Sequence, residues 1–181
     1  MTEEGIAASE AMLGPEQRVA QLGLRLPSVV PPVGNYVRAA RTGNLLFVSG
    51  HLPDSAGAPD HAGKLGRDLT TAEGYQAARQ ATISLLGTIR QALGSLDRVT
   101  QVIKVFGMVN STEDFTEQPQ VINGASDLLQ EVFGPAAVHA RSAVGMAQLP
   151  RNNCVEVEAV IEFAGPASPA SGEPAAPPPH A

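Results

Sequence analysis

Arg141 and Glu156 are the side chains whose type and setting best suit chemistry in this sequence. Arg141 stands near the start of a strand-like run among small residues, Ala140, Ser142 and Ala143, so its guanidinium projects into free space. A guanidinium in such a setting can hold a carboxylate through two parallel hydrogen bonds. Because charged side chains are mostly exposed, an arginine at the surface or in an ion pair is the alternative.

Glu156 opens the polar side of the last strand-like run, in which apolar and charged residues alternate. A carboxylate that is partly desolvated at this position could orient or activate a water molecule as a general base. The alternative is a solvated strand face that Glu156 shares with Glu158 and Glu162.

The histidines give no metal signature. None of the four is spaced i, i+4 from another, and the sequence also lacks G-x-S-x-G, a phosphate-binding glycine loop and C-x-x-C. We therefore expect no metal and no cofactor. His51 and His139 adjoin the strand-like runs and are candidates for substrate contact, with simple packing as the alternative.

Composition narrows the classes of function. The 181 residues suit one domain, and 43% hydrophobic residues suffice for a core. A net charge of −6 and the lack of a basic run argue against nucleic acid as a partner. Cys154 is the single cysteine, which excludes an internal disulfide. Without a long apolar stretch or a secretory signal, we expect a cytoplasmic protein with no membrane partner.

Hydrophobic periodicity and turn residues predict three helices and five strands. The helices cover 15–22, 72–93 and 119–133, and the second begins after the capping box Thr70-x-x-Glu73. The strands cover 36–40, 45–50, 99–109, 140–149 and 155–163. A long loop rich in Gly and Pro is expected over 51–69.

This order of elements predicts an α+β fold in which two long helices cover one face of a mixed, largely antiparallel sheet, with hairpins at both ends. The second face of the sheet must be solvated or buried in an oligomer. We expect an N-terminal extension with a short helix over 1–23, a single domain over 24–164 and a disordered, Pro- and Ala-rich tail over 165–181.

The last two strands are expected to form an antiparallel hairpin closed by Leu149 and Cys154. Arg141 would then face Glu162, and by parity Glu156 would lie on the same face of the sheet as Arg141. The two would be separated by roughly six residues along the strands, or about 20 Å. Within one chain they could not share a substrate, so a shared site would need a neighbouring subunit.

The sequence resembles the RidA (YjgF-type) imine deaminase family over about residues 24–163. The segment 140–150 followed by 155–159 is similar to the family's C-terminal signature, A-R-S/T-x-V-x-V-x-x-L-P, a turn, and V/I-E-I/V-E-A. Upstream, 34–37 resembles the G-P-Y-S/V strand, 48–53 resembles S-G-Q-I/L-P, and 96–99 resembles the turn after the first long helix. Residues 118–133, together with His139, resemble a less characterised branch with a longer loop before the second long helix.

The resemblance implies a chorismate-mutase-like fold that assembles as a homotrimer, with sheets lining a central barrel and clefts between subunits. It implies that Arg141 binds the substrate carboxylate and that Glu156 positions the hydrolytic water. Tyr36, Gly50 and Asn123 match other cleft positions, and the backbone of Ala143 would contact the substrate nitrogen. For Tyr36 and Asn123 the alternatives are strand packing and a helix-start cap.

The implied reaction is hydrolysis of enamines or imines of the 2-aminoacrylate type to 2-oxo acids and ammonia, without a cofactor. The sequence departs from the archetype where Ala143 replaces a frequent Cys and His51 replaces the usual Gln. These departures favour, as an alternative, a non-catalytic trimer that binds a carboxylate metabolite or acts in regulation. Endoribonuclease activity, a label that some relatives carry, is the weaker alternative because the chain is acidic and has no histidine pair.

Overall fold

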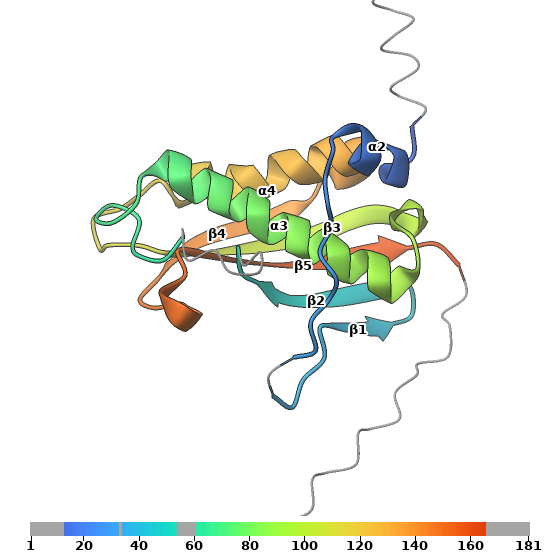
Figure 1. Ribbon diagram of the computed structural model, residues 1–181, viewed down its shortest axis with the longest axis horizontal. Coiled ribbons are helices and arrows are strands. Elements are labelled where there is room, and N and C mark those ends of the chain that lie inside the picture. Colours follow the sequence, from blue (N-terminus) through green and yellow to red (C-terminus); the bar gives the residue numbers. More distant parts are fainter. Residues whose placement is uncertain (1–12, 33, 54–60, 166–181) are drawn as a thin grey trace, which may run out of the picture.

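A five-stranded sheet carries two long helices on one of its faces. The computed structural model describes residues 13–32, 34–53 and 61–165. Figure 1 shows α3 (Thr71–Leu93) and α4 (Gln118–Phe133) lying across the sheet, with the short α2 (Pro15–Gln21) at one end. The expected α+β class, with both long helices on the same face, is confirmed.

The strands follow the order β1-β2-β5-β3-β4 across the sheet, and in the described chain only β3 and β4 pair in parallel. Their bounds are β1 (Ala39–Thr42), β2 (Leu45–His51), β3 (Val99–Asn110), β4 (Ala140–Met146) and β5 (Val155–Phe163). Three single 3₁₀ turns link them: η1 (Leu96–Arg98), η2 (Gly134–Ala137) and η3 (Pro150–Asn152).

The expected hairpin between the last two strands is wrong. β4 pairs in parallel with β3, in the register Val105↔Arg141, whereas β5 lies between β2 and β3. The physical reason is the intervening helix: β3, α4 and β4 form one crossover unit, and a helix that returns the chain to the neighbouring position makes the two strands parallel. The chain then crosses the end of β3, where Asn110 N donates to the carbonyl of Cys154.

The hairpin at the start of the sheet is confirmed, but its first strand begins later than expected. Thr42 pairs with Leu45, which leaves Gly43 and Asn44 as a two-residue turn. Gly43 adopts a φ of 55°, a conformation that suits glycine in such turns. Pairing outward from this tight turn ends at Ala39, so Tyr36 precedes the sheet rather than lying in it.

The capping box of the long helix is confirmed. The Thr70 side chain accepts from the backbone N–H of Glu73, and the Glu73 carboxylate accepts from the backbone N–H of Thr70 at 2.8 Å. The helix ends at Gly94, whose φ of 85° is the left-handed conformation typical of a helix C-terminus.

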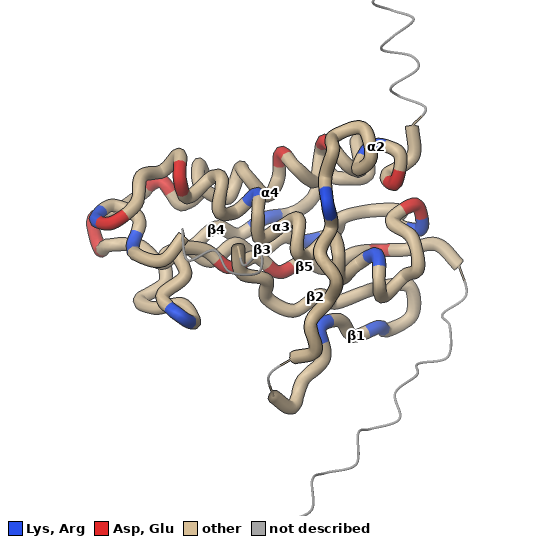
Figure 2. The backbone as a smooth tube through the Cα atoms, in the orientation of Figure 1, with Lys and Arg blue, Asp and Glu red and all other residues tan. Residues whose placement is uncertain are grey.

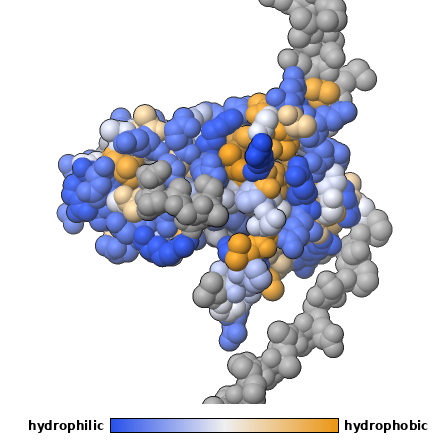
Figure 3. All heavy atoms as spheres, in the orientation of Figure 1, coloured by the Kyte–Doolittle hydropathy of each residue, from blue (hydrophilic) through white to orange (hydrophobic). Residues whose placement is uncertain are grey.

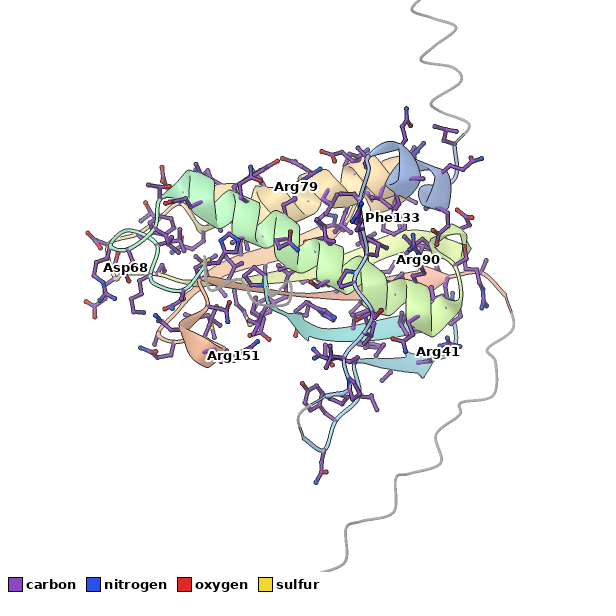
Figure 4. The ribbon with its side chains drawn as sticks, viewed as in Figure 1. Arg41, Asp68, Arg79, Arg90, Phe133 and Arg151 are labelled. Carbon is purple, nitrogen blue, oxygen red and sulfur yellow. The ribbon has the colours of Figure 1, made fainter. Side chains whose placement is uncertain are left out.

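The two long helices approach each other closely at Gly124. A Cβ at this position would lie 2.0 Å from the carbonyl oxygen of Tyr75, so the backbone of α4 rests against that of α3. Nearby, Arg79 of α3 forms an ion pair with Glu131 of α4 at 2.6 Å, and Figure 4 shows Arg79 between the two helices. This contact fixes α4 relative to the rest of the domain.

The connector between α2 and β1 crosses the outer side of α3. It lies so close to Gly87 that a Cβ there would be 2.7 Å from the carbonyl oxygen of Pro27. Leu24 and Leu26 of this connector pack against the core, and Figure 3 shows apolar side chains where it passes over α3. Val19 of α2 belongs to the core as well.

The expected loop over 51–69 and tail over 165–181 are only partly described, since 54–60 and 166–181 lie outside the described residues. The second half of the loop is tied down by Lys64, whose Nζ donates to Asn110 Oδ1 at 2.7 Å and to the carbonyl of Ala147 at 2.6 Å. None of the helices in the described ranges has the length and apolar character needed to span a bilayer.

Candidate functional site

Arg141 lies on the edge strand β4, on the face of the sheet that α4 covers. It is paired with the buried Val105, and its guanidinium reaches the helix. Nη1 donates to Oδ1 of Asn123 at 2.8 Å and to Oγ of Ser126 at 3.0 Å, and Nη2 donates to the carbonyl of Pro119 at 3.4 Å. Three neutral acceptors from one helix therefore hold the charged group.

This arrangement leaves one edge of the guanidinium open. Of the five N–H donors of an arginine, three are engaged, and Nε–H and one Nη2–H have no partner among the described residues. Within the same residues no carboxylate forms an ion pair with Arg141. Two adjacent donors on a planar cation match the two oxygens of a carboxylate. Arg141 is partly exposed, and among the described residues it is held by neutral acceptors rather than by a carboxylate.

Asn123 and Ser126 stand about one turn apart on α4, and both bind the guanidinium. Asn123 lies well inside the helix that begins at Gln118, so the alternative of a helix-start cap is wrong. The Ser126 Oγ is also 3.1 Å from Nε2 of His139, while Nδ1 of His139 faces the carbonyl of Ala137. The structure thus places His139 one contact away from Arg141.

Ala143 follows Arg141 on the same side of β4 and packs partly against the core. Because β4 is an edge strand, its outer backbone edge has no strand partner in the described chain. An unpaired edge offers N–H and C=O groups that a ligand or another chain can bind. The outer edge of β4 therefore offers backbone groups close to the guanidinium.

Glu156 lies on the opposite face of the sheet, against the backbone of Gly50. A Cβ at Gly50 would come within 1.8 Å of Glu156 Oε1, so the absence of a side chain is what admits the carboxylate. This half-buried carboxylate makes no hydrogen bond or ion pair with the described residues. Burial, and then the charge of Glu158, raise the pKa of Glu156. A base of raised pKa with free oxygens can take a proton from water.

His51 follows Gly50 but points to the helix side of the sheet. Its ring is buried; Nδ1 is 2.7 Å from the carbonyl of Ser49, and Nε2 is 2.7 Å from Oγ1 of Thr88 on α3. Since a carbonyl only accepts, Nδ1 carries the proton and the Thr88 hydroxyl donates to Nε2. Burial lowers the pKa of His51 to about 4. The ring is thus not brought to Arg141 or to Glu156.

Tyr36 lies in the connector before β1 and is 49% exposed. The alternative of strand packing is therefore wrong for this residue. Its backbone N–H donates to the carbonyl of Gly34 at 3.0 Å, which closes a short turn.

Arg141 and Glu156 do not share a face of the sheet, and that expectation is wrong. Arg141 is level with Val105 of β3 and Glu156 with Met108, and the two side chains leave the sheet on opposite sides. The error follows from the pairing: with β3 between them, the parity of a direct hairpin does not apply. Three residues along and two strands across place their Cα atoms about 14 Å apart. The conclusion that they cannot share a substrate within one chain therefore holds, for a different reason.

Other chemistry finds little support in the described part of the chain. Cys154 is buried, and burial raises the pKa of its thiol to about 12, which suppresses the nucleophilic thiolate. No group of three His, Cys, Asp or Glu there could hold a metal ion. Figure 2 shows Lys and Arg interspersed with Asp and Glu rather than gathered in one stripe.

Ser126 is the residue of this site that sequence reasoning missed. A serine inside a helix carries no pattern of its own, and its hydroxyl commonly bonds within the helix. The available signal was its position three residues after Asn123, which places both side chains on one helix face.

Comparisons with known proteins show the family to which the chain belongs. Residues 16–163 match the family described as "YjgF/chorismate mutase-like, putative endoribonuclease". Protein TCP17 of Trypanosoma cruzi is 46% identical over 144 residues, which cover 79% of this chain and 90% of that protein. A 2-iminobutanoate/2-iminopropanoate deaminase of Dermatophagoides farinae is 27% identical over 135 residues, covering 75% and 91%.

Solved structures of similar proteins share this fold. The protein Atu1372 of Agrobacterium tumefaciens, described as of unknown function, has a TM-score of 0.76 at 42% identity, covering 83% of this chain and 94% of that one. A protein of Shewanella oneidensis MR-1, described as an endoribonuclease candidate, has a TM-score of 0.80 at 36% identity, covering 83% and 100%.

Proposed function

The chain belongs to the YjgF/chorismate mutase-like family, and from this premise we propose that it hydrolyses small imines or enamines of the 2-aminoacrylate type to 2-oxo acids and ammonia. The observation that carries the proposal is the open two-donor edge of Arg141, which suits a carboxylate. The related deaminase of Dermatophagoides farinae supports the same reaction class.

The chemistry needs only binding, orientation and proton transfer. Arg141 holds the carboxylate of the imine, with Asn123 and the backbone of Ala143 beside it. Glu156 takes a proton from water as the oxygen attacks the imine carbon, and the nitrogen is protonated as the C=N double bond becomes single. The carbinolamine then loses its C–N bond: the hydroxyl proton leaves, the nitrogen departs as ammonia, and a 2-oxo acid remains. One imine and one water molecule thus give one 2-oxo acid and one ammonia.

We place this reaction between subunits of a homotrimer. Arg141 and Glu156 lie on opposite faces of one sheet, so a complete site takes Arg141 from one subunit and Glu156, with Gly50 and Tyr36, from its neighbour. The uncovered face of the sheet supports an assembly, since Phe47 is 47% and Ile103 39% exposed there. Apolar side chains in that position favour contact with another protein surface.

The first test compares wild type with Arg141→Ala on 2-iminopropanoate and 2-iminobutanoate, by ammonia release or semicarbazone competition. We expect acceleration by the wild type that disappears in the variant. If a folded wild-type protein leaves the lifetimes of both imines unchanged, the deaminase proposal fails. The second candidate function is then a carboxylate-binding protein without catalytic activity, which the open edge of Arg141 favours on its own. Binding of 2-oxo acids, measured by calorimetry, tests it.

Mixed assembly tests the shared site. Arg141→Ala and Glu156→Gln chains are each expected to be inactive, yet unfolding and refolding them together in equal amounts should restore about a quarter of wild-type activity. That fraction follows because each interface of a cyclic oligomer draws one residue from each neighbour. No recovery in a mixture that reassembles would contradict the shared site.

Endoribonuclease activity, the weaker alternative, is tested with the same variant. RNA cleavage that persists in Arg141→Ala would indicate a contaminating nuclease.

A further inference from the structure

His139 and Ser126 are joined to Arg141 by an ordered series of hydrogen bonds. The carbonyl of Ala137 can only accept, so Nδ1 of His139 donates to it and, in the neutral ring, Nε2 is an acceptor. The Ser126 hydroxyl, 3.1 Å from Nε2, is the donor to this nitrogen. Its oxygen then has lone pairs left for Nη1 of Arg141 at 3.0 Å.

The direction of these bonds fixes how the guanidinium is turned. Ser126 takes one hydrogen of Nη1, and Asn123 takes the other at 2.8 Å. Nη1 is then fully used and one Nη2–H is directed to Pro119, so Nε–H and the second Nη2–H are the donors left without a partner among the described residues. Rotation of the guanidinium would break the hydrogen bonds of Nη1 and that of Nη2 together.

His139 gives the Ser126 hydroxyl an acceptor outside its own helix. A serine inside a helix commonly turns its hydroxyl back to the carbonyl four residues earlier. In α3, Ser84 shows this arrangement, with its Oγ 3.5 Å from the carbonyl of Gln80. The acceptor nitrogen of His139 gives the Ser126 hydroxyl a partner on the side of β4, so the Ser126 oxygen stays beside Arg141.

We propose that Ser126 and His139 are positioning residues, which act on the ligand through Arg141 and hold its Nε–Nη2 edge toward the carboxylate. This assigns a role to Ser126 and replaces direct substrate contact as the role of His139. The carboxylate ligand rests on the proposed function, whereas the orientation of Arg141 is a property of the free protein.

Nitrogen NMR of the ligand-free protein tests the orientation directly. We expect His139 in the Nδ1–H form and slowed rotation of the Arg141 guanidinium. Ser126→Ala should release that rotation, Ser126→Thr should retain it because the hydroxyl remains, and Ser84→Ala, the matched helical serine, should leave it unchanged. Unchanged Arg141 signals in Ser126→Ala, or an Nε2–H form of His139, would overturn the proposal.

A double-mutant cycle tests the consequence for binding, with 2-oxobutanoate as the probe and calorimetry as the measurement. Ser126→Ala and His139→Phe should each raise Kd about 10-fold, the size of one hydrogen bond to a charged group. Neither should raise it further in an Arg141→Ala background. If the substitutions weaken 2-oxobutanoate binding equally with and without Arg141, their effect is a general structural one, which would contradict the positioning role. If the wild type does not bind 2-oxobutanoate, the proposed function loses its ligand, and the NMR result alone decides the orientation.

Discussion

The region around Arg141 and the region around Glu156 are built in opposite ways within one sheet. Arg141 is held by three acceptors from α4, all neutral, so its charge is fixed in place and left uncompensated among the described residues. Glu156 has no hydrogen-bond partner there, is half-buried against Gly50, and stands near a like charge on Glu158.

Under the proposed function, this difference separates the residues that bind the ligand from those that react with it. The Arg141 region is prepared to bind, because its donors are oriented before a ligand arrives. The Glu156 region is prepared to react, because a poorly solvated carboxylate gains most from taking up a proton. One chain carries Arg141 and Glu156 on opposite faces of the sheet, so the proposed function takes the two residues of one site from neighbouring chains.

The largest effect that would sharpen this comparison is expected for Arg141→Lys. The charge remains but the two-donor edge is lost, so kcat/KM should fall about 10²- to 10⁴-fold, equivalent to two hydrogen bonds to a charged group. Steady-state kinetics on 2-iminobutanoate measure it. Activity within a factor of three of wild type would mean that charge alone suffices and that the edge has no special role.

Glu156→Gln should produce a loss of about 10²- to 10³-fold that falls on kcat, with little change in KM. The amide keeps the shape of the carboxylate but cannot accept the proton from water. If instead KM rises and kcat is preserved, the two regions do not divide binding from reaction. Thermal unfolding of the variant serves as the control for folding.

His51 beside the Glu156 region should make stability depend on pH. Its folded pKa of about 4 lies below the ordinary 6.5, so between these values the unfolded chain binds a proton that the native state does not. Stability is therefore full above pH 6.5 and falls by about 3 kcal/mol as pH drops to 4. Urea unfolding at pH 7 and pH 4.5 should show a smaller loss in His51→Gln; equal losses would contradict the assignment.

The smallest effect is expected for Glu158→Gln, which removes the like charge near Glu156. The pKa of Glu156 should fall toward its ordinary value, and the acidic limb of the kcat profile should move to lower pH, while the Arg141 region is untouched. A pH–rate profile measures the shift. A limb that moves to higher pH would contradict the cause given for the raised pKa.

Local patterns predicted the helices and the alternating strand well, because caps and periodicity act over a few residues. Thr70 and Glu73 formed the expected capping box, and all five odd-numbered residues from Val155 to Phe163 are buried. The alternation of β5 reports which side is buried but not which strand lies next to it. Its place between β2 and β3 therefore could not be read from the pattern.

The candidate site was predicted in part for the same reason. Arg141 stood out through its small neighbours, and the resemblance added Asn123, which binds it. The face of Glu156 relative to Arg141 depends on strand order, which is a long-range property, so it was assigned wrongly. Ser126 was missed because its hydroxyl gains meaning only when β4 lies beside α4.

The position of β5 has a consequence for how the chain folds. The last strand in the sequence occupies the middle of the sheet, so β1 and β2 on one side and β3 and β4 on the other share no strand pairing until β5 enters between them. Its contacts with β2 span more than a hundred residues, and such distant pairings slow folding. We therefore expect the sheet to close in a late step of folding, and a chain cut before Val155 to lose the strand that joins the β1–β2 pair to the β3–β4 pair.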